Sequence, residues 1–129
     1  MLILDENVSE NEIWRLREAG FSVRVIGQEI AVKSVTDENI IPILLKLKKP
    51  TFFTRDRDFW KPQLRHDRYA IVFMDIPEHE GEIAKYIALF LRHRSFNTST
   101  KRLGRIFHIQ NSQIHCRNRT GIVIHKWER

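Results

Sequence analysis

The sequence predicts an α/β fold in which a mainly parallel central sheet lies between layers of helices. Short apolar segments typical of strands alternate with helix-like segments up to about residue 93, and this alternation is typical of β-α-β units. The segment 69–74 is almost wholly apolar, as expected for a strand buried on both faces of a parallel sheet. The 129 residues contain no repeat or flexible linker, which predicts one domain over residues 1–129.

The N-terminal half contains the signals for three strands and two helices. Strands are expected over residues 2–4, 21–25 and 51–54. Ser9 and Glu12 have the spacing of a capping box, so the first helix is expected to start there and to end at Gly20. The second helix is expected after Thr36, a typical N-cap residue, with Pro42 about one turn in.

The C-terminal half is expected to add a strand, a long helix and a β-rich tail. The strand covers 69–74 and the helix runs from Glu78 to about His93. Residues 104–129 form a basic β extension: strands over 105–110 and 114–119 flank a turn, as in a C-terminal β-hairpin, and 122–124 is a further short strand. We expect this tail to extend an edge of the sheet or to pack beside it.

The charge of the chain is unevenly distributed along the sequence. Residues 1–91 carry a net charge of −2, whereas residues 92–129 carry +8 and contain a single acidic residue, Glu128. A basic cluster of this kind attracts polyanions because bound cations release condensed counterions from nucleic acid. We therefore expect RNA as a partner of the tail, although a basic surface without a partner has the same composition.

The composition excludes several classes of protein. No apolar run approaches the length of about 20 residues that spans a bilayer, and the N-terminus lacks the pattern of a secretory signal. Cys116 is the only cysteine, so neither an intramolecular disulfide nor a cysteine-rich zinc site is possible. We expect a cytoplasmic protein without a membrane partner.

Acidic residues follow the expected strands, where the chemistry of an α/β protein is usually located. Asp5 follows the first strand, Asp56 and Asp58 follow the third, and Asp37 and Glu38 open the second helix. In open α/β sheets, ligands bind outside the carboxyl ends of the strands. We expect these side chains to converge on one end of the sheet, with Asp56 and Asp58 on one face if the chain stays extended.

Several carboxylates in one place favour a hard divalent cation. Mg²⁺ and Mn²⁺ prefer oxygen ligands, and such an ion activates water and neutralises the charge of a phosphodiester. Each acid also has a structural alternative: Asp5 as a turn residue, Asp37 or Glu38 as first-turn helix residues, and Asp56 with Asp58 as a hydrogen-bonded Asx loop.

Three segments, taken in order, resemble the short PIN-like proteins of prokaryotes, distant relatives of VapC-type toxin ribonucleases. They are Leu-Ile-Leu-Asp-Glu-Asn at 2–7, Thr-Asp-Glu-Asn-Ile at 36–40 and Phe-Thr-Arg-Asp-Arg-Asp-Phe at 53–59. The third segment is the most specific, and the resemblance covers about residues 1–110. It implies a PIN-like three-layer α/β/α fold and a metal-dependent endoribonuclease, often the toxin of a toxin–antitoxin pair.

The resemblance also implies roles for individual residues. The acidic pocket would comprise Asp5, Asp37, Asp56 and Asp58, with Glu38 as an alternative ligand to its neighbour Asp37. Thr54 would support the pocket or contact the substrate. Arginines near the pocket and in the tail are the expected phosphate contacts: Arg55, Arg57, Arg102, Arg105 and Arg117. An antitoxin protein and a second copy of the chain are further candidate partners.

Two other functions compete with the nuclease. A non-catalytic PIN-like module would bind RNA or a protein without cleaving RNA. A phosphoacceptor receiver domain is suggested only by Asp75 after an apolar strand, and the separation of Asp75 from Asp5 speaks against it.

Overall fold

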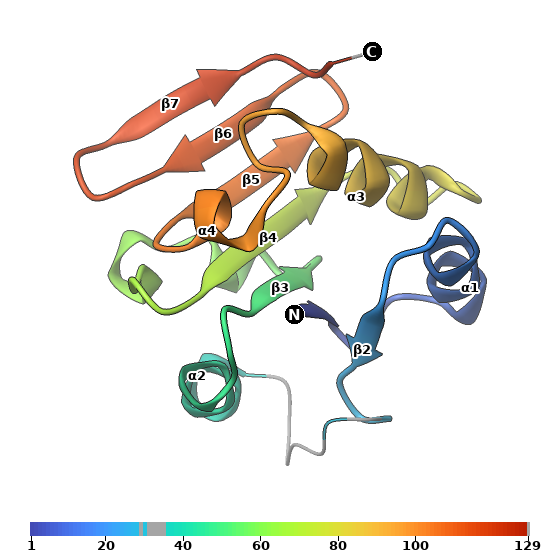
Figure 1. The fold of residues 1–129 in the computed structure, drawn as a ribbon, viewed down its shortest axis with the longest axis horizontal. Coiled ribbons are helices and arrows are strands. Elements are labelled where there is room, and N and C mark those ends of the chain that lie inside the picture. Colours follow the sequence, from blue (N-terminus) through green and yellow to red (C-terminus); the bar gives the residue numbers. More distant parts are fainter. Residues whose placement is uncertain (29, 31–35, 129) are drawn as a thin grey trace.

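The computed structural model describes residues 1–28, 30 and 36–128, except for the side chain of Asp37. In this part of the chain, seven strands form one sheet in the order β2-β1-β3-β4-β5-β6-β7 (Figure 1). The strands are β1 (Leu2–Leu4), β2 (Val23–Val25), β3 (Thr51–Thr54), β4 (Ala70–Asp75), β5 (Ile106–Gln110), β6 (Ile114–Arg117) and β7 (Ile122–His125). The fold is therefore α/β, as the sequence predicts.

The first five strands in this order are parallel, and only β6 and β7 pair antiparallel. The parallel order 2-1-3-4-5 is a common order of doubly wound sheets. In such sheets the chain moves outward in opposite directions from β1 and β3, and a crevice for ligands opens at the carboxyl ends of these two strands. The strand order thus locates the first place to search for a site.

Helices lie on both faces of the sheet. They are α1 (Glu10–Glu18), α2 (Asp37–Lys46), α3 (Glu82–Arg92) and α4 (Ser99–Arg102), with the short 3-10 helices η1 (Arg57–Phe59) and η2 (Pro62–Leu64). On one face α1 and α3 lie side by side and share a hydrophobic core with Leu4 and Val72. On the other, α2 and η1 share a second core with Ile3 and Phe52.

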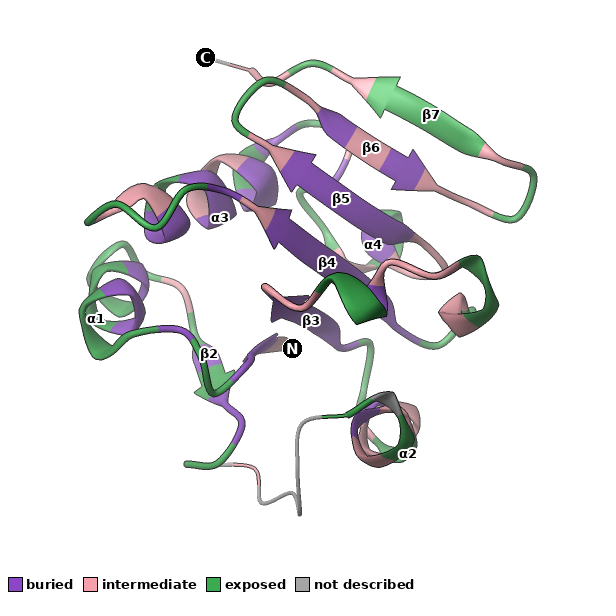
Figure 2. Cartoon of the chain, turned by 180° about the vertical axis from the view of Figure 1, so that it is seen from behind, coloured by how far each residue is buried: buried purple, intermediate pink, exposed green. Residues whose placement is uncertain are grey.

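We call the second side the α2 face. It is the side of the sheet toward which Ile3, Phe52, Ile71 and Ile106 point. The two cores arise because successive residues of a strand point to opposite faces, so the fully buried strand β3 contributes Phe52 to one core and Phe53 to the other. Figure 2, which looks onto the α2 face, shows no helix in front of β5, β6 and β7.

The capping box expected at the first helix does not form. The side chain of Ser9 makes no capping hydrogen bond. The buried carboxylate of Glu12 accepts hydrogen bonds from the backbone N–H groups of Gly81 and Ala84 instead, at 3.1 Å each. Glu12 therefore caps α3, and α3 begins at Glu82 rather than at Glu78 as expected.

No helix in the described part of the chain is both long enough and apolar enough to cross a membrane.

Candidate functional site

The carboxyl ends of β1 and β3 meet at Asp5 and Thr54. Leu4 lies opposite Phe53 in the parallel pair, and the backbone N–H of Asp5 donates to the carbonyl oxygen of Phe53 at 3.0 Å. Asp5 is 1% exposed and Thr54 is fully buried. The hydroxyl of Thr54 donates to Oδ2 of Asp5 at 2.7 Å, so the sheet itself fixes the position of this carboxylate.

The same hydroxyl connects Asp5 to Asp56. The backbone N–H of Asp56 donates to Oγ1 of Thr54 at 3.1 Å. Acids separated by 51 positions in the chain are therefore held around one threonine oxygen, as the convergence of strand ends predicts. Thr54 acts by orienting Asp5, and its burial keeps it from contacting a substrate directly.

Oδ1 of Asp5 is buried and has no hydrogen-bond partner among the described residues. Burial raises the pKa of Asp5 above its ordinary value, and the hydrogen bond from Thr54, together with smaller effects of the backbone N–H groups of Glu6 and Asn7, only partly offsets this rise. A buried carboxylate oxygen without a partner costs free energy. A cation bound at this oxygen would remove that cost, which makes Asp5 the clearest candidate ligand in the described structure.

Asp56 and Asp58 do not share an extended face, contrary to the sequence expectation. The chain turns into η1 directly after Asp56, and Oδ1 of Asp56 accepts the backbone N–H of Asp58 at 2.9 Å. This is the Asx arrangement that the sequence left open. Asp56 remains partly exposed beside Thr54, whereas Asp58 is exposed on η1.

The second acidic position is only partly described. Asp37 is the first residue of α2, but its side chain lies outside the described residues. Glu38, the alternative ligand, is exposed. Ile40, less than one turn further on, is buried in the core of the α2 face with Ile3 and Ile26, so the first turn of α2 lies on the same side of the sheet as Ile3.

Two of the described acidic residues, Asp5 and Asp56, are candidate ligands for a divalent cation. Among the described residues, no group of three or more His, Cys, Asp or Glu side chains is arranged to hold a metal. Mg²⁺, however, is commonly held by one or two carboxylates and several waters. Asp5 offers its unpartnered oxygen. Asp56 lies next to Asp5 through its backbone N–H, which contacts the same threonine, while Oδ1 of its carboxylate accepts the N–H of Asp58.

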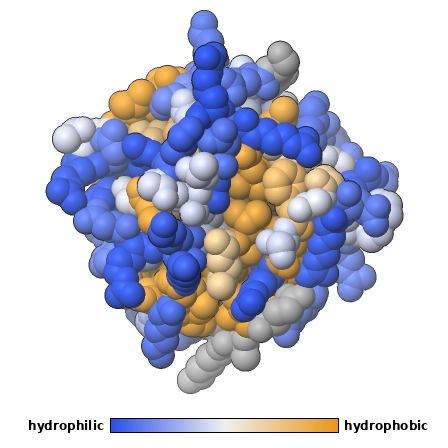
Figure 3. All heavy atoms as spheres, viewed as in Figure 1, coloured by the Kyte–Doolittle hydropathy of each residue, from blue (hydrophilic) through white to orange (hydrophobic). Residues whose placement is uncertain are grey.

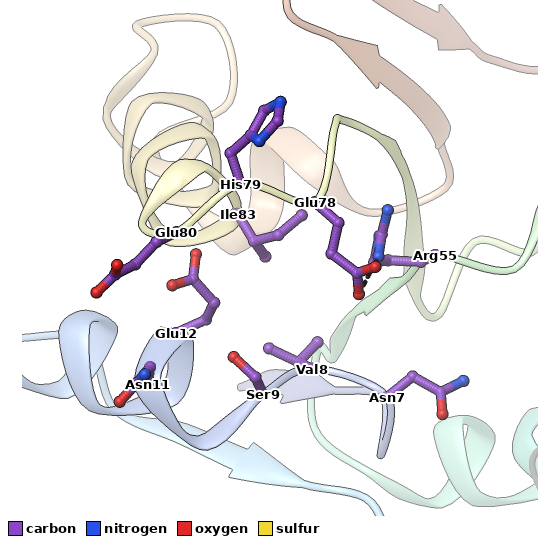
Figure 4. Close-up of a pocket in the computed structure, with 10 residues that line it drawn as sticks. All are labelled: Asn7, Val8, Ser9, Asn11, Glu12, Arg55, Glu78, His79, Glu80 and Ile83. Carbon is purple, nitrogen blue, oxygen red and sulfur yellow. Dashed lines mark ion pairs between the residues drawn. The ribbon is translucent and has the colours of Figure 1, made fainter.

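A cavity of about 280 Å³ opens next to these acids, between the start of α1 and the loop that leads into α3 (Figure 4). Its rim includes Asn7, two residues after Asp5, and Arg55, which precedes Asp56. Val8 and Ile83 also line it. None of Asp5, Asp56 and Asp58 lines this cavity, so the candidate site lies beside it.

The two arginines near the site have different environments. Arg55 points toward the loop before α3, where its guanidinium donates to the carbonyl oxygen of Ile76 at 3.1 Å and pairs with Glu78 at 2.8 Å. The side chain of Arg57 is 68% exposed and lies over the ring of Phe73 on the α2 face. Arg57 is therefore the more accessible of the two for a phosphate.

One of the tail arginines, Arg102, is not accessible to a phosphate as the sequence suggests. Arg102 is 5% exposed, and its guanidinium donates to Thr51 and to the carbonyl oxygen of Phe96, both at 2.9 Å. Burial lowers the pKa of Arg102 to about 10. This side chain is a buried structural element, unavailable to a phosphate, which corrects the expectation.

Arg105 and Arg117 lie at the end of the sheet where the parallel strands begin, whereas Asp5 lies at the end where they finish. Arg105 directly precedes β5, which is parallel to β1 through β3 and β4, and Arg117 ends the antiparallel strand β6 opposite Ile106. A phosphate at the candidate metal site cannot touch them. Of the two, Arg117 faces the α2 face, where its guanidinium lies 5.4 Å from the centre of the Trp60 ring.

The sequence did not identify two groups of residues that the structure brings together. Trp60, His108 and Arg117 meet on the α2 face, and the only sequence signal was the position of histidines and arginines on tail strands. Asp75, the residue behind the receiver alternative, hydrogen bonds to His108 at 2.9 Å and faces Arg57 at 3.6 Å. The carboxylate of Asp75 thus forms the second group, together with His108 and Arg57.

Neither a protein-family model, nor a curated protein, nor a solved structure matches this chain.

Proposed function

We propose that this protein is a metal-dependent endoribonuclease that holds Mg²⁺ or Mn²⁺ at Asp5 and Asp56. The observation that carries the proposal is the buried, unpartnered Oδ1 of Asp5 at the crevice between β1 and β3. The net charge of +8 on residues 92–129 supports a polyanionic substrate. A toxin role, with an antitoxin protein that covers this edge of the sheet, belongs to the same proposal.

The chain's own residues have distinct tasks in this proposal. A bound divalent ion supplies neutralising charge for a phosphodiester and acidifies water. Asp5 provides the rigid ligand, because Thr54 and the sheet hold it in one position. Asp56 provides the more accessible carboxylate. Arg57 is the next residue in the chain, and its exposed guanidinium would bind a phosphate next to the one at the metal.

The test compares Asp56→Asn with Asp67→Asn in a cleavage assay on single-stranded RNA, with Mn²⁺ added to protein prepared in EDTA. Asp67 is a matched control, because it is exposed and pairs with Arg65 and Arg119 away from the site. We expect Asp56→Asn to lower the cleavage rate by about 100-fold or more, since a metal ligand is lost, and Asp67→Asn to cleave at the wild-type rate.

Binding of Mn²⁺ gives a readout that does not depend on activity. We expect Mn²⁺ to raise the melting temperature of the wild type and to have no such effect on Asp5→Asn. The nuclease proposal is wrong if the wild type does not cleave RNA in Mn²⁺, or if Asp56→Asn and Asp67→Asn cleave equally fast.

A second candidate is a non-catalytic RNA-binding module. It is favoured by one observation: Oδ1 of Asp56 already accepts the N–H of Asp58, as in an ordinary Asx turn. The same experiments separate the two candidates, because a module binds RNA with the same affinity in Mn²⁺ and in EDTA and cleaves none.

A further inference from the structure

A group of cationic and aromatic side chains lies on the α2 face, where no helix covers β5, β6 and β7 (Figure 2). We call it the sheet-face strip, and it consists of Arg57, Trp60, Phe73, His108, His115 and Arg117. We propose that this strip binds a single-stranded segment of RNA. The inference rests on the proposed function for the class of ligand, but it assigns a surface that lies outside the metal site.

The strip is continuous across the three neighbouring strands β4, β5 and β6. Arg57 lies over the ring of Phe73, with 5.2 Å between the guanidinium carbon and the ring centre. The ring centre of Phe73 is 4.7 Å from that of His108, which is 5.3 Å from that of Trp60. Arg117 lies over Trp60 at the far end. These contacts therefore run across the sheet, from Phe73 on β4 to Arg117 on β6.

The strip begins next to the candidate metal site. Arg57 is the first residue of η1, immediately after Asp56. From there the strip leads across β4 and β5 to β6, where Arg117 pairs across from Ile106. A strand of RNA cut at Asp5 and Asp56 could therefore continue over the strip without leaving the protein surface.

The charges of the strip favour a polyanion. Among the described residues, Arg117 makes no ion pair, and its Nε is buried without a hydrogen-bond partner. Asp75, beside the strip, contacts both His108 and Arg57, and Asp56 and Asp58 flank Arg57 in the chain. Arg117 is thus the cation of the strip that a phosphate can pair with without displacing a carboxylate.

The shapes of the side chains favour unpaired bases over a duplex. Phe73 and His108 are buried, so the groups available for stacking are the partly exposed rings of Trp60 and His115 and the guanidinium of Arg117, which lies over the Trp60 ring. Bases stack on aromatic rings and on guanidinium planes only when they are splayed out of a helix. A duplex would present only its phosphates to this surface, because its bases are already stacked on one another and cannot stack on the side chains.

The test measures RNA affinity by fluorescence anisotropy of a labelled 12-nucleotide single strand in EDTA, so that cleavage plays no part. The variant is Arg117→Met, and the matched control is Arg92→Met on α3. Arg92 also holds its guanidinium over an aromatic ring, that of Phe21 at 5.3 Å, but α3 lies on the other face of the sheet. Both changes remove one positive charge and keep an apolar stem.

We expect Arg117→Met to weaken binding by roughly 5- to 10-fold and to reduce the salt dependence of affinity by about one phosphate contact. The control should change affinity by less than about two-fold. Arg57→Met, at a side chain that is 68% exposed, should weaken binding in the same direction.

Two results would overturn the inference. One is an equal effect of Arg117→Met and Arg92→Met, which would indicate unspecific attraction by net charge. The other is failure of the wild type to bind the single strand, or tighter binding of a duplex of the same length, which would leave the strip to a protein partner. Failure of the nuclease proposal is distinguishable, because binding in EDTA then persists without cleavage in Mn²⁺.

Discussion

At the scale of single residues, the protein places a carboxylate where water cannot reach it. Oδ2 of Asp5 has a partner in Thr54, and Oδ1 has none among the described residues. In a protein without a ligand such a group is a source of instability, because the charged form is poorly solvated. Under the proposed function, a cation bound at Oδ1 would make the arrangement favourable, and this difference can be measured.

The raised pKa of Asp5 predicts how stability depends on pH in the absence of metal. Because the folded protein holds the proton more tightly than the unfolded chain, with its ordinary value of 3.8, the contribution of protonated Asp5 is complete below that pH. It is lost as the pH rises through the folded-state pKa, with a slope of at most about 1.4 kcal/mol per pH unit.

Urea denaturation in EDTA between pH 4 and pH 8 checks this prediction. The free energy of unfolding of the wild type should fall relative to that of Asp5→Asn as the pH rises, and Mn²⁺ should reverse the fall at neutral pH. A difference between the two proteins that stays constant across this range would contradict the pKa assignment.

At the scale of elements, contacts between helices rather than local capping determine where α3 begins. The sequence pairs Ser9 with Glu12, but the carboxylate of Glu12 binds the N–H groups of Gly81 and Ala84 across the α1–α3 contact. Two charge-assisted hydrogen bonds at a buried helix N-terminus contribute more than one exposed cap. Local spacing could not reveal this, because the partner is about 70 residues away.

Replacement of Glu12 therefore should destabilise the fold. We expect Glu12→Ala to lower the free energy of unfolding by about 2 to 3 kcal/mol, because two N–H groups of α3 lose their acceptor. Glu10→Ala removes an exposed first-turn acid from the same helix and should cost less than about 0.5 kcal/mol. Chemical denaturation of both variants decides the point, and equal losses would show that Glu12 does not support α3.

The candidate site divides in the same way into a part that the sequence predicts and a part that it does not. Asp5 and Thr54 could be placed together because parallel strands end at the same edge of a sheet. The turn into η1 after Asp56 could not, since an Asp-x-Asp segment fits an extended chain and an Asx turn equally well. Arg102 resembled a phosphate ligand by charge alone, and its burial depends on the packing of α4.

At the scale of the whole molecule, the pattern of residues in the sequence could not predict the order of the strands in the sheet. Alternating elements predict parallel strands but leave their order open. The chain passes from β1 to β2 through α1 and from β4 to β5 through α3, and these two connections run in opposite directions along the sheet. Because α1 and α3 nevertheless lie on the same face, the two connections have opposite handedness. Since almost all such crossovers are right-handed, a topology derived from general rules would have placed α3 on the other face.

The long sheet ends at β7, an edge strand with an unusual surface. Ile122, Val123 and Ile124 are 47%, 49% and 58% exposed, and Figure 3 shows an apolar patch at its upper left, over β7. Edge strands of stable monomers are commonly protected by charged residues, Pro or bulges. These three consecutive apolar residues offer another chain both open backbone groups and side chains to pack against.

We therefore expect the purified protein to associate with itself through β7 as its concentration rises. Val123→Lys should reduce this association, because a charge on the edge strand opposes pairing with a second copy. Trp14→Lys is the matched control: it replaces another exposed apolar side chain, 61% exposed, with the same charge, but on α1 rather than on a sheet edge. Sedimentation velocity at several concentrations measures the outcome. Equal association of the two variants would mean that general surface hydrophobicity, and not the open edge of the sheet, brings the copies together.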